Sequence, residues 1–145
     1  MRPELSVDAA QLSTMISHAV APAFLLNAIA ALVTILVGRM ARVTDRIRSL
    51  NQISDDDISR VWLKADIARL KRREALLHNA LHLAVFGGIG VTVLLLMGFL
   101  VAFLGYRHEP GAAVLFIVAL CFLLGSFVRF LQDVRLSMSE PDHHH

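Results

Sequence analysis

The sequence predicts an all-α membrane protein. It has three transmembrane helices, a long cytoplasmic helical hairpin between the first and second, and a short amphipathic helix at the N-terminus. Apolar residues make up 56% of the 145 residues and charged residues 18%, against about 45–50% and 25% in soluble domains. Three stretches, 19–38, 83–105 and 111–128, carry no charged side chain. Each has close to the roughly 20 residues that cross a hydrocarbon core about 30 Å thick. The rest of this short chain is too small to shield three such helices from water. We therefore expect all three to cross a bilayer.

The positions of the basic residues predict the orientation. Ten of the 14 lysines and arginines stand between the first and second uncharged stretches, and Arg129 and Arg135 follow the third. The opposite side would hold Arg2 and Arg107. Basic residues concentrate in cytoplasmic loops, so we expect an outside N-terminus and a cytoplasmic C-terminus.

The N-terminal segment 7–20 has the pattern of an amphipathic helix. Leu12, Met15 and Ile16 share one face, with Ser13 and Ser17 opposite. We expect this helix to lie on the outer membrane surface. The first transmembrane helix should then cover 21–38.

The connection 39–79 is predicted to be a helical hairpin. Between Gly38 and Gly87 there is neither glycine nor proline, which favours uninterrupted helix. The best turn is 51–54, and Ser54 followed by three aspartates is typical of a helix start. The second helix would run from there into the second transmembrane segment, 80–105.

The remaining third of the chain completes the layout. Residues 106–111, with Pro110 and Gly111, predict a short outer turn. The third transmembrane helix should cover 112–130, followed by a cytoplasmic tail, 131–145. Residues 143–145 are three histidines that resemble a purification tag and are left out of the chemistry.

The first transmembrane helix carries the most informative stripe. Asn27 and Thr34 are seven residues apart and therefore share a helical face. Extended along the helix, this candidate pore-lining face contains Ser17, Phe24, Asn27, Ala31, Thr34 and Gly38. One interpretation is the lining of a pore, which requires several copies of the chain around one axis. The other is helix packing through small residues, with Asn27 bonded to a neighbouring helix.

A basic ridge follows this helix. It consists of Arg39, Arg42, Arg46 and Arg48, of which the first three are spaced to lie on one face. Such a ridge can bind the phosphates of anionic lipids and set the topology. In an oligomer it would form a ring of arginines at the inner mouth of a pore.

The stretch from Ile16 to Leu50, ISHAVAPAFLLNAIAALVTILVGRMARVTDRIRSL, resembles a bacterial membrane family known as domain of unknown function 2721. The resemblance rests on the Ala-Pro-x-Phe-Leu-Leu start and on the Arg-x-x-Arg-x-x-Asp-Arg-x-Arg end, here Arg39 to Arg48. The basic segment 71–73 and the two following spans also resemble that family, so the likeness covers most of the chain. It implies a bacterial inner-membrane protein, and it brings no established activity and no catalytic residue.

The second transmembrane helix has a stripe of small residues at four-residue spacing, formed by Ala80, Ala84, Gly88 and Thr92. This stripe is typical of helix packing. Glu74, His78 and His82 share a face at the inner boundary, where they are weak candidates for a metal site that a neighbouring subunit would have to complete. We predict no metal site within one chain and no cofactor.

These features exclude some functions and leave two. The uncharged spans hold no acid, base or nucleophile apart from the lone Cys121, so an enzyme or a proton-coupled transporter is not expected. The first expectation is a homo-oligomer that forms an ion-conducting channel lined by the first transmembrane helix. The alternative is a membrane scaffold or regulatory adaptor whose hairpin, with Trp62, binds a partner protein or anionic lipid. The expected partners are a lipid bilayer with anionic headgroups at the inner face, other copies of the chain and inorganic ions, and no nucleic acid.

Overall fold

The computed structural model describes residues 9–104 and 109–139, and their regular structure is entirely helical. Helix α1 covers Ala9–Asn51, a 3₁₀ helix η1 covers Val61–Asp66, α2 covers Ile67–Leu104 and α3 covers Glu109–Met138. Three of the helices are long and apolar enough to cross a membrane. This confirms the predicted all-α chain with three candidate membrane-spanning helices.

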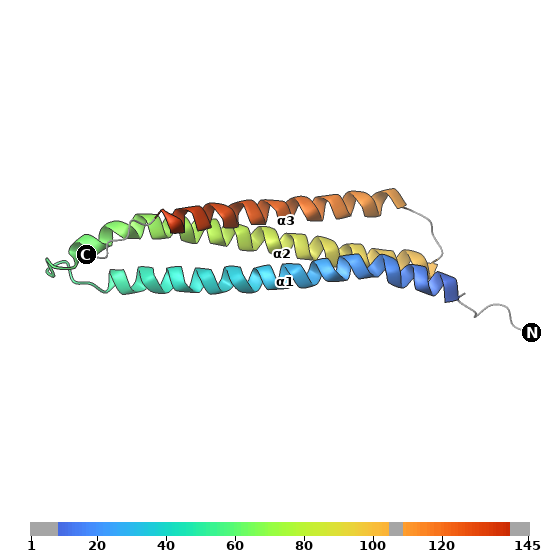
Figure 1. Ribbon diagram of the computed structural model, residues 1–145, viewed down its shortest axis with the longest axis horizontal. Helices are drawn as coiled ribbons and strands as arrows, with labels where there is room; N and C mark the ends of the chain where they lie inside the picture. Colours follow the sequence, from blue (N-terminus) through green and yellow to red (C-terminus); the bar gives the residue numbers. More distant parts are fainter. Residues whose placement is uncertain (1–8, 105–108, 140–145) are drawn as a thin grey trace, which may run out of the picture.

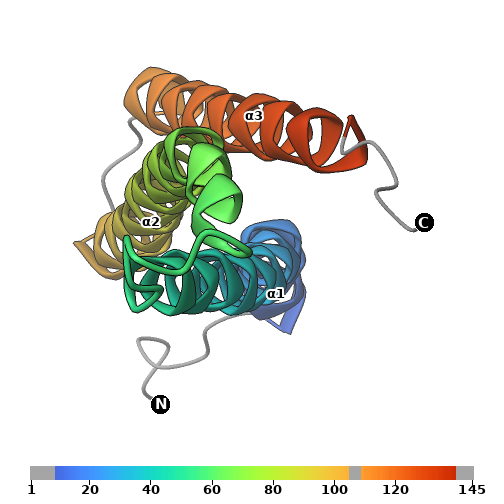
Figure 2. The ribbon, with the colours of Figure 1, turned by 90° about the vertical axis from the view of Figure 1, so that its left-hand side faces the viewer.

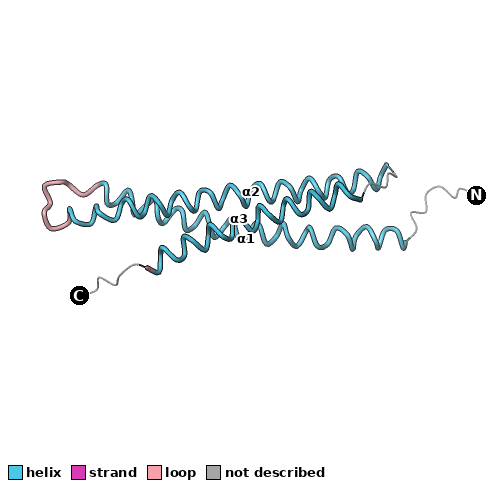
Figure 3. Tube along the Cα trace, turned by 90° about the horizontal axis from the view of Figure 1, so that it is seen from above, coloured by secondary structure: helices cyan, strands magenta, loops and turns pink. Residues whose placement is uncertain are grey.

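The three long helices lie side by side along one axis (Figure 1). Helix α1 runs to the loop at one end, α2 returns from it, and α3 packs on α2. Viewed from that end, α2 lies between the other two helices (Figure 2). The connection between α1 and α2 contains the irregular segment seen in Figure 3. We call the end of the bundle that carries this connection the loop end.

The helices pack through positions that repeat every seven residues, the spacing of coiled-coil contacts. The residues buried on these repeats are Pro22, Ile29, Leu36, Val43 and Leu50 on α1, Leu77, Ala84 and Val91 on α2, and Ala119, Ser126 and Asp133 on α3. We call these buried residues the seam. The seam is narrow, and large side chains such as Phe24 and Phe103 remain 71% and 88% exposed. In lipid such side chains are solvated by acyl chains, so the pattern fits a membrane protein.

Glycine lets α2 and α3 approach closely. A Cβ atom on Gly87 would lie 3.3 Å from the backbone oxygen of Ala119, and one on Gly90 would lie 3.1 Å from the Ala119 Cβ atom. Small residues at such contacts allow the van der Waals packing that holds membrane helices together.

Two expectations near the N-terminus and the loop need correction. The structure does not support a separate amphipathic helix over 7–20, because α1 is one helix from Ala9 to Asn51 that includes Pro22. Residues 1–8 lie outside the described part. Helix α2 does not begin at Ser54 either: its regular turns start at Ile67, after η1.

Local side-chain bonds explain the late start of α2. The Ser54 hydroxyl accepts a hydrogen bond from the Asp56 amide at 3.3 Å, and the Ser59 hydroxyl donates to Asp57 at 2.6 Å. Serine and aspartate side chains compete in this way with helical hydrogen bonds. The side chains of Ser54 and Asp57 therefore stabilise turns instead of a helix start.

Helix α3 extends beyond the residues expected for the third span. Helix α3 continues to Met138, eight residues beyond the expected limit of the third span at 130. The first half of the expected outer turn 106–111 falls on residues 106–108, which lie outside the described part, as do 140–145 with the three final histidines; its second half, 109–111, is the start of α3. Gly111 belongs to α3.

Candidate functional site: an arginine–aspartate cluster

A buried carboxylate joins the three long helices near the loop end. Asp133 on α3 is fully buried. Its Oδ2 atom accepts hydrogen bonds from Nη2 and Nε of Arg39 on α1, at 2.7 and 2.9 Å. Its Oδ1 atom accepts one from Nε of Arg73 on α2, at 3.0 Å. One side chain from each helix therefore meets at a single point, which we call the Asp133 cluster.

The helices bring these residues together through the seven-residue repeat. Asp133 follows Ala119 and Ser126 on the α3 seam, and Arg73 precedes the buried Ala80 by seven residues. The side chains of Arg39 and Arg73 are 26% and 14% exposed. A buried carboxylate is tolerated when it is paired and hydrogen-bonded, and here both of its oxygens are.

Further polar contacts hold the helices near the cluster. Arg69 donates to the backbone oxygen of Leu136 at 2.5 Å and to the Ser139 hydroxyl at 3.1 Å, which satisfies a terminal carbonyl of α3. The Thr44 hydroxyl donates to Glu74 at 3.0 Å and so links α1 to α2. The loop end is therefore fixed by polar bonds among all three helices.

Sequence reasoning missed Asp133. Its position seven residues after Ser126 and fourteen after Ala119 was the available signal, since a polar residue on a packing repeat often fixes the register. That signal required knowing that α3 continues past residue 130, whereas the predicted third span ends there and 131–145 is predicted to be a tail. Ser126 was also missed, although it lies within the predicted third span; its buried hydroxyl donates to the Ala80 oxygen on α2 at 2.7 Å.

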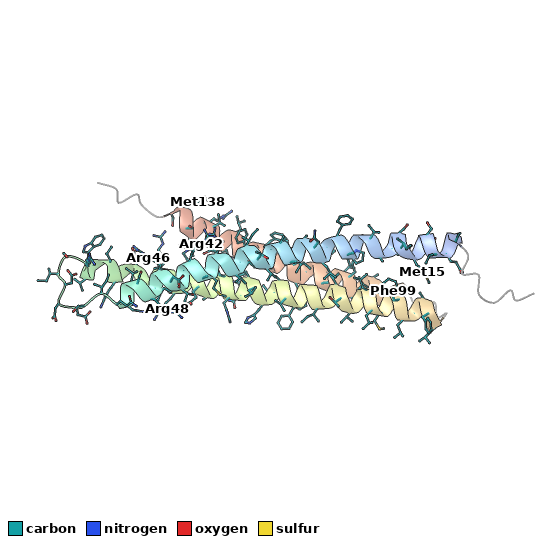
Figure 4. The ribbon with its side chains drawn as sticks, turned by 90° about the horizontal axis from the view of Figure 1, so that it is seen from below. Met15, Arg42, Arg46, Arg48, Phe99 and Met138 are labelled. Carbon is teal, nitrogen blue, oxygen red and sulfur yellow. The ribbon has the colours of Figure 1, made fainter. Side chains whose placement is uncertain are left out.

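The structure divides the predicted basic ridge. Arg39 belongs to the Asp133 cluster and its guanidinium also lies 5.4 Å from the ring centre of Phe130. Arg42, Arg46 and Arg48 are exposed. Figure 4 shows Arg42 and Arg46 on one side of α1 and Arg48 on the other.

The candidate pore-lining face points away from the other helices. Ser17, Phe24, Asn27, Ala31 and Thr34 are exposed, and Gly38 is partly buried. At 3.6 residues per turn, this face lies opposite the buried seam of α1. Apart from the partly buried Gly38, this face is therefore exposed on the outside of the bundle.

The small residues of α2 take different places. Ala80 and Ala84 are fully buried, and a Cβ atom on Gly88 would lie 3.5 Å from Ile29 of α1. Thr92 is exposed and its hydroxyl donates to the Gly88 oxygen of its own helix. The stripe thus faces α1 and α3 at its first positions and turns outward at its last.

The candidate metal ligands do not form a site in the described chain. Glu74 accepts the hydroxyl of Thr44, while the rings of His78 and His82 stack edge to face with centres 4.2 Å apart. In residues 9–104 and 109–139, no three histidine, cysteine or acidic side chains are grouped to hold a metal ion.

The connection at the loop end has its own ion pair. Lys64 of η1 donates to Asp55 at 2.5 Å. This hydrogen bond and the positive charge of Lys64 lower the pKa of the fully exposed Asp55 carboxyl. The pair ties η1 to the preceding turns.

Comparison with known proteins adds one finding. A family model described as "Protein of unknown function (DUF2721)" matches residues 19–142. The chain belongs to this family. The match confirms the resemblance seen in the sequence, and the Asp133 cluster lies within the matched DUF2721 region. No curated protein and no solved structure matches the chain. This DUF2721 chain is therefore a multi-helix membrane protein.

Proposed function

We propose that the protein is a multi-pass inner-membrane protein that forms a homo-oligomer, in which the exposed stripe of α1 surrounds a shared axis and lines an ion-conducting channel. In this arrangement the N-terminus is periplasmic and the loop end is cytoplasmic. The proposal includes no catalytic role, since the buried carboxylate, Asp133, is engaged by two arginines.

The position of Asn27 carries this proposal. Asn27 is exposed near the middle of the uncharged stretch 19–38, and within the described residues its side chain makes no hydrogen bond. An unpaired amide in hydrocarbon costs about 4–8 kcal/mol. The other polar groups of the stripe are satisfied locally, because Thr34 and Ser17 donate to the backbone of their own helix. Asn27 is thus the residue that gains most from a second copy of the chain or from water on a shared axis.

Reconstitution tests the proposal. Purified protein in liposomes should pass ions, and Asn27→Leu should reduce both the flux and the fraction of oligomer in detergent. Asn79→Leu is the matched control, since Asn79 is exposed on α2 and lies off the stripe. A monomer in detergent, no flux, or equal effects of the two substitutions would refute the channel.

A second candidate function is a scaffold or regulatory adaptor. The connection between α1 and α2 exposes 86% of Ile58 and 60% of Trp62. If the loop end lies in water, these apolar side chains fit a surface that binds a partner protein. Photo-cross-linking from position 62 in cells should then capture another protein, whereas recovery of self-contacts alone would refute the adaptor.

A further inference from the structure

The cavity nearest the Asp133 cluster is strongly basic. It lies between α1 and α2 beside the end of α3 and has a volume of about 290 Å³. Its charged lining consists of Arg39, Arg42, Arg46, Arg69, Arg73 and Asp66. Even with the buried Asp133 added to Asp66, arginines exceed carboxylates by three.

The arginines differ in how far they are already engaged. Arg39 and Arg73 share Asp133, and Arg69 donates to the end of α3. Arg42 uses Nε for the Gly38 oxygen at 3.2 Å and retains its two terminal nitrogens. The Arg46 side chain makes no hydrogen bond or ion pair among the described residues. Arg42 and Arg46 therefore have donors for a ligand, and their neighbours add positive potential.

The chemistry of the lining selects the ligand. Guanidinium groups bind phosphate oxygens through paired, charge-assisted hydrogen bonds. The partly buried Ser137 adds a hydroxyl donor to the lining. The volume is near the lower limit of about 300–1,000 Å³ for drug-sized ligand pockets, which suits a small anion.

The location of the cavity indicates where the ligand comes from. Arg39 is the first charged residue after the uncharged stretch 19–38. A bilayer around that stretch would place the cavity at headgroup depth. We propose that this cavity binds a phosphate group, carried by a lipid or free in solution, with Arg42 and Arg46 as its principal ligands. The site lies within one chain, so it stands whether or not the channel proposal holds.

Binding measurements on the full-length protein test this site. The protein is purified in dodecyl maltoside, which contains no phosphate, and titrated in a calorimeter at constant ionic strength. One arm uses inorganic phosphate, and the other uses short-chain phosphatidylglycerol. The site variant is Arg42→Gln with Arg46→Gln, and the matched control is Arg48→Gln with Arg72→Gln, two exposed arginines outside the cavity.

We expect saturable binding of at least one probe, with about one ligand per chain. The site variant should raise the Kd by about tenfold or more, as expected for lost charged hydrogen bonds. The control pair should change the Kd less than about twofold. Binding of phosphate alone would identify a free anion, and binding of the lipid alone would identify a headgroup. If neither probe saturates, or if both pairs weaken binding equally, the site does not exist. Arg42 and Arg46 contribute nothing to the Asp133 cluster, so the helix content by circular dichroism should be unchanged.

Discussion

The carboxylate of Asp133 accepts two hydrogen bonds from Arg39, at 2.7 and 2.9 Å, although the two residues are 94 positions apart in the chain. This contact joins the first long helix to the last across a bundle in which α2 lies between them. Arg73 completes the cluster from α2. The loop end of the molecule is therefore held by charge as well as by packing.

Replacing Asp133 should destabilise the bundle more than replacing any exposed carboxylate. Asp133→Ala leaves Arg39 and Arg73 partly buried without their counter-ion, and removing one partner of a buried pair costs about 3–5 kcal/mol. Unfolding in a dodecyl sulfate titration measures the loss. Asp45→Ala, at an exposed site on α1, should change the free energy of unfolding little. Equal effects would mean that the cluster does not stabilise the fold.

The Ser126 hydroxyl should contribute a smaller amount. It donates to the Ala80 oxygen of α2 at 2.7 Å in a fully buried position. Hydrogen bonds between membrane helices contribute about 0.6–2 kcal/mol, so Ser126→Ala should lower the free energy of unfolding by that amount. Ser49→Ala is the control, because Ser49 bonds within its own helix. No loss at Ser126 would show that this bond does not hold α3 to α2.

Two glycines of α2 should differ sharply in how well they tolerate replacement by leucine. Gly90→Leu places a side chain where even a Cβ atom would lie 3.1 Å from that of Ala119, whereas Gly98 has nothing within 4 Å. Overpacking typically costs about 1–3 kcal/mol, so Gly90→Leu should destabilise the protein and Gly98→Leu should not. The same unfolding titration compares them. Equal tolerance at the two positions would contradict the close approach of α2 and α3.

The ion pair between Asp55 and Lys64 should be visible in a pH titration. Lys64 lowers the pKa of Asp55 below the ordinary value of 3.8. The contribution of the pair to stability is therefore present above pH 3.8 and lost as pH falls through the lower folded-state pKa. Carboxyl carbon NMR should show the lowered pKa and its return towards 3.8 in Lys64→Gln. Lys71→Gln should leave it unchanged, and an unshifted Asp55 in the wild type would refute the pair.

The apolar helices could be predicted from sequence because their signal is compositional. Twenty uncharged residues identify a span whatever it packs against, so all three were found. The buried seam was harder to predict, because in a span nearly every position is apolar and hydrophobicity does not distinguish a protein-facing side from a lipid-facing one.

Two other features could not be predicted from the sequence: the start of α2 and the partners of Asp133. Ser54 and the aspartates after it have the composition of a helix start, yet their side chains close turns with Asp56 and Ser59. Asp133 had no visible partner in sequence, since Arg39 and Arg73 are remote and surrounded by other arginines. Only the packing of α3 on α2 decides which arginines contact Asp133.

In the proposed assembly the exposed stripe of α1 faces other copies of the chain, and cysteine cross-linking tests this contact most directly. In a Cys121→Ala background, single cysteines replace Asn27, Ala31 and Thr34 on the stripe and Ile35 and Val37 on its flanks, all exposed positions. Oxidation in native membranes should produce linked dimers at the three stripe positions and few at the two flanking ones. Cross-linking at none of them, or equally at all five, would contradict an assembly around this face of α1.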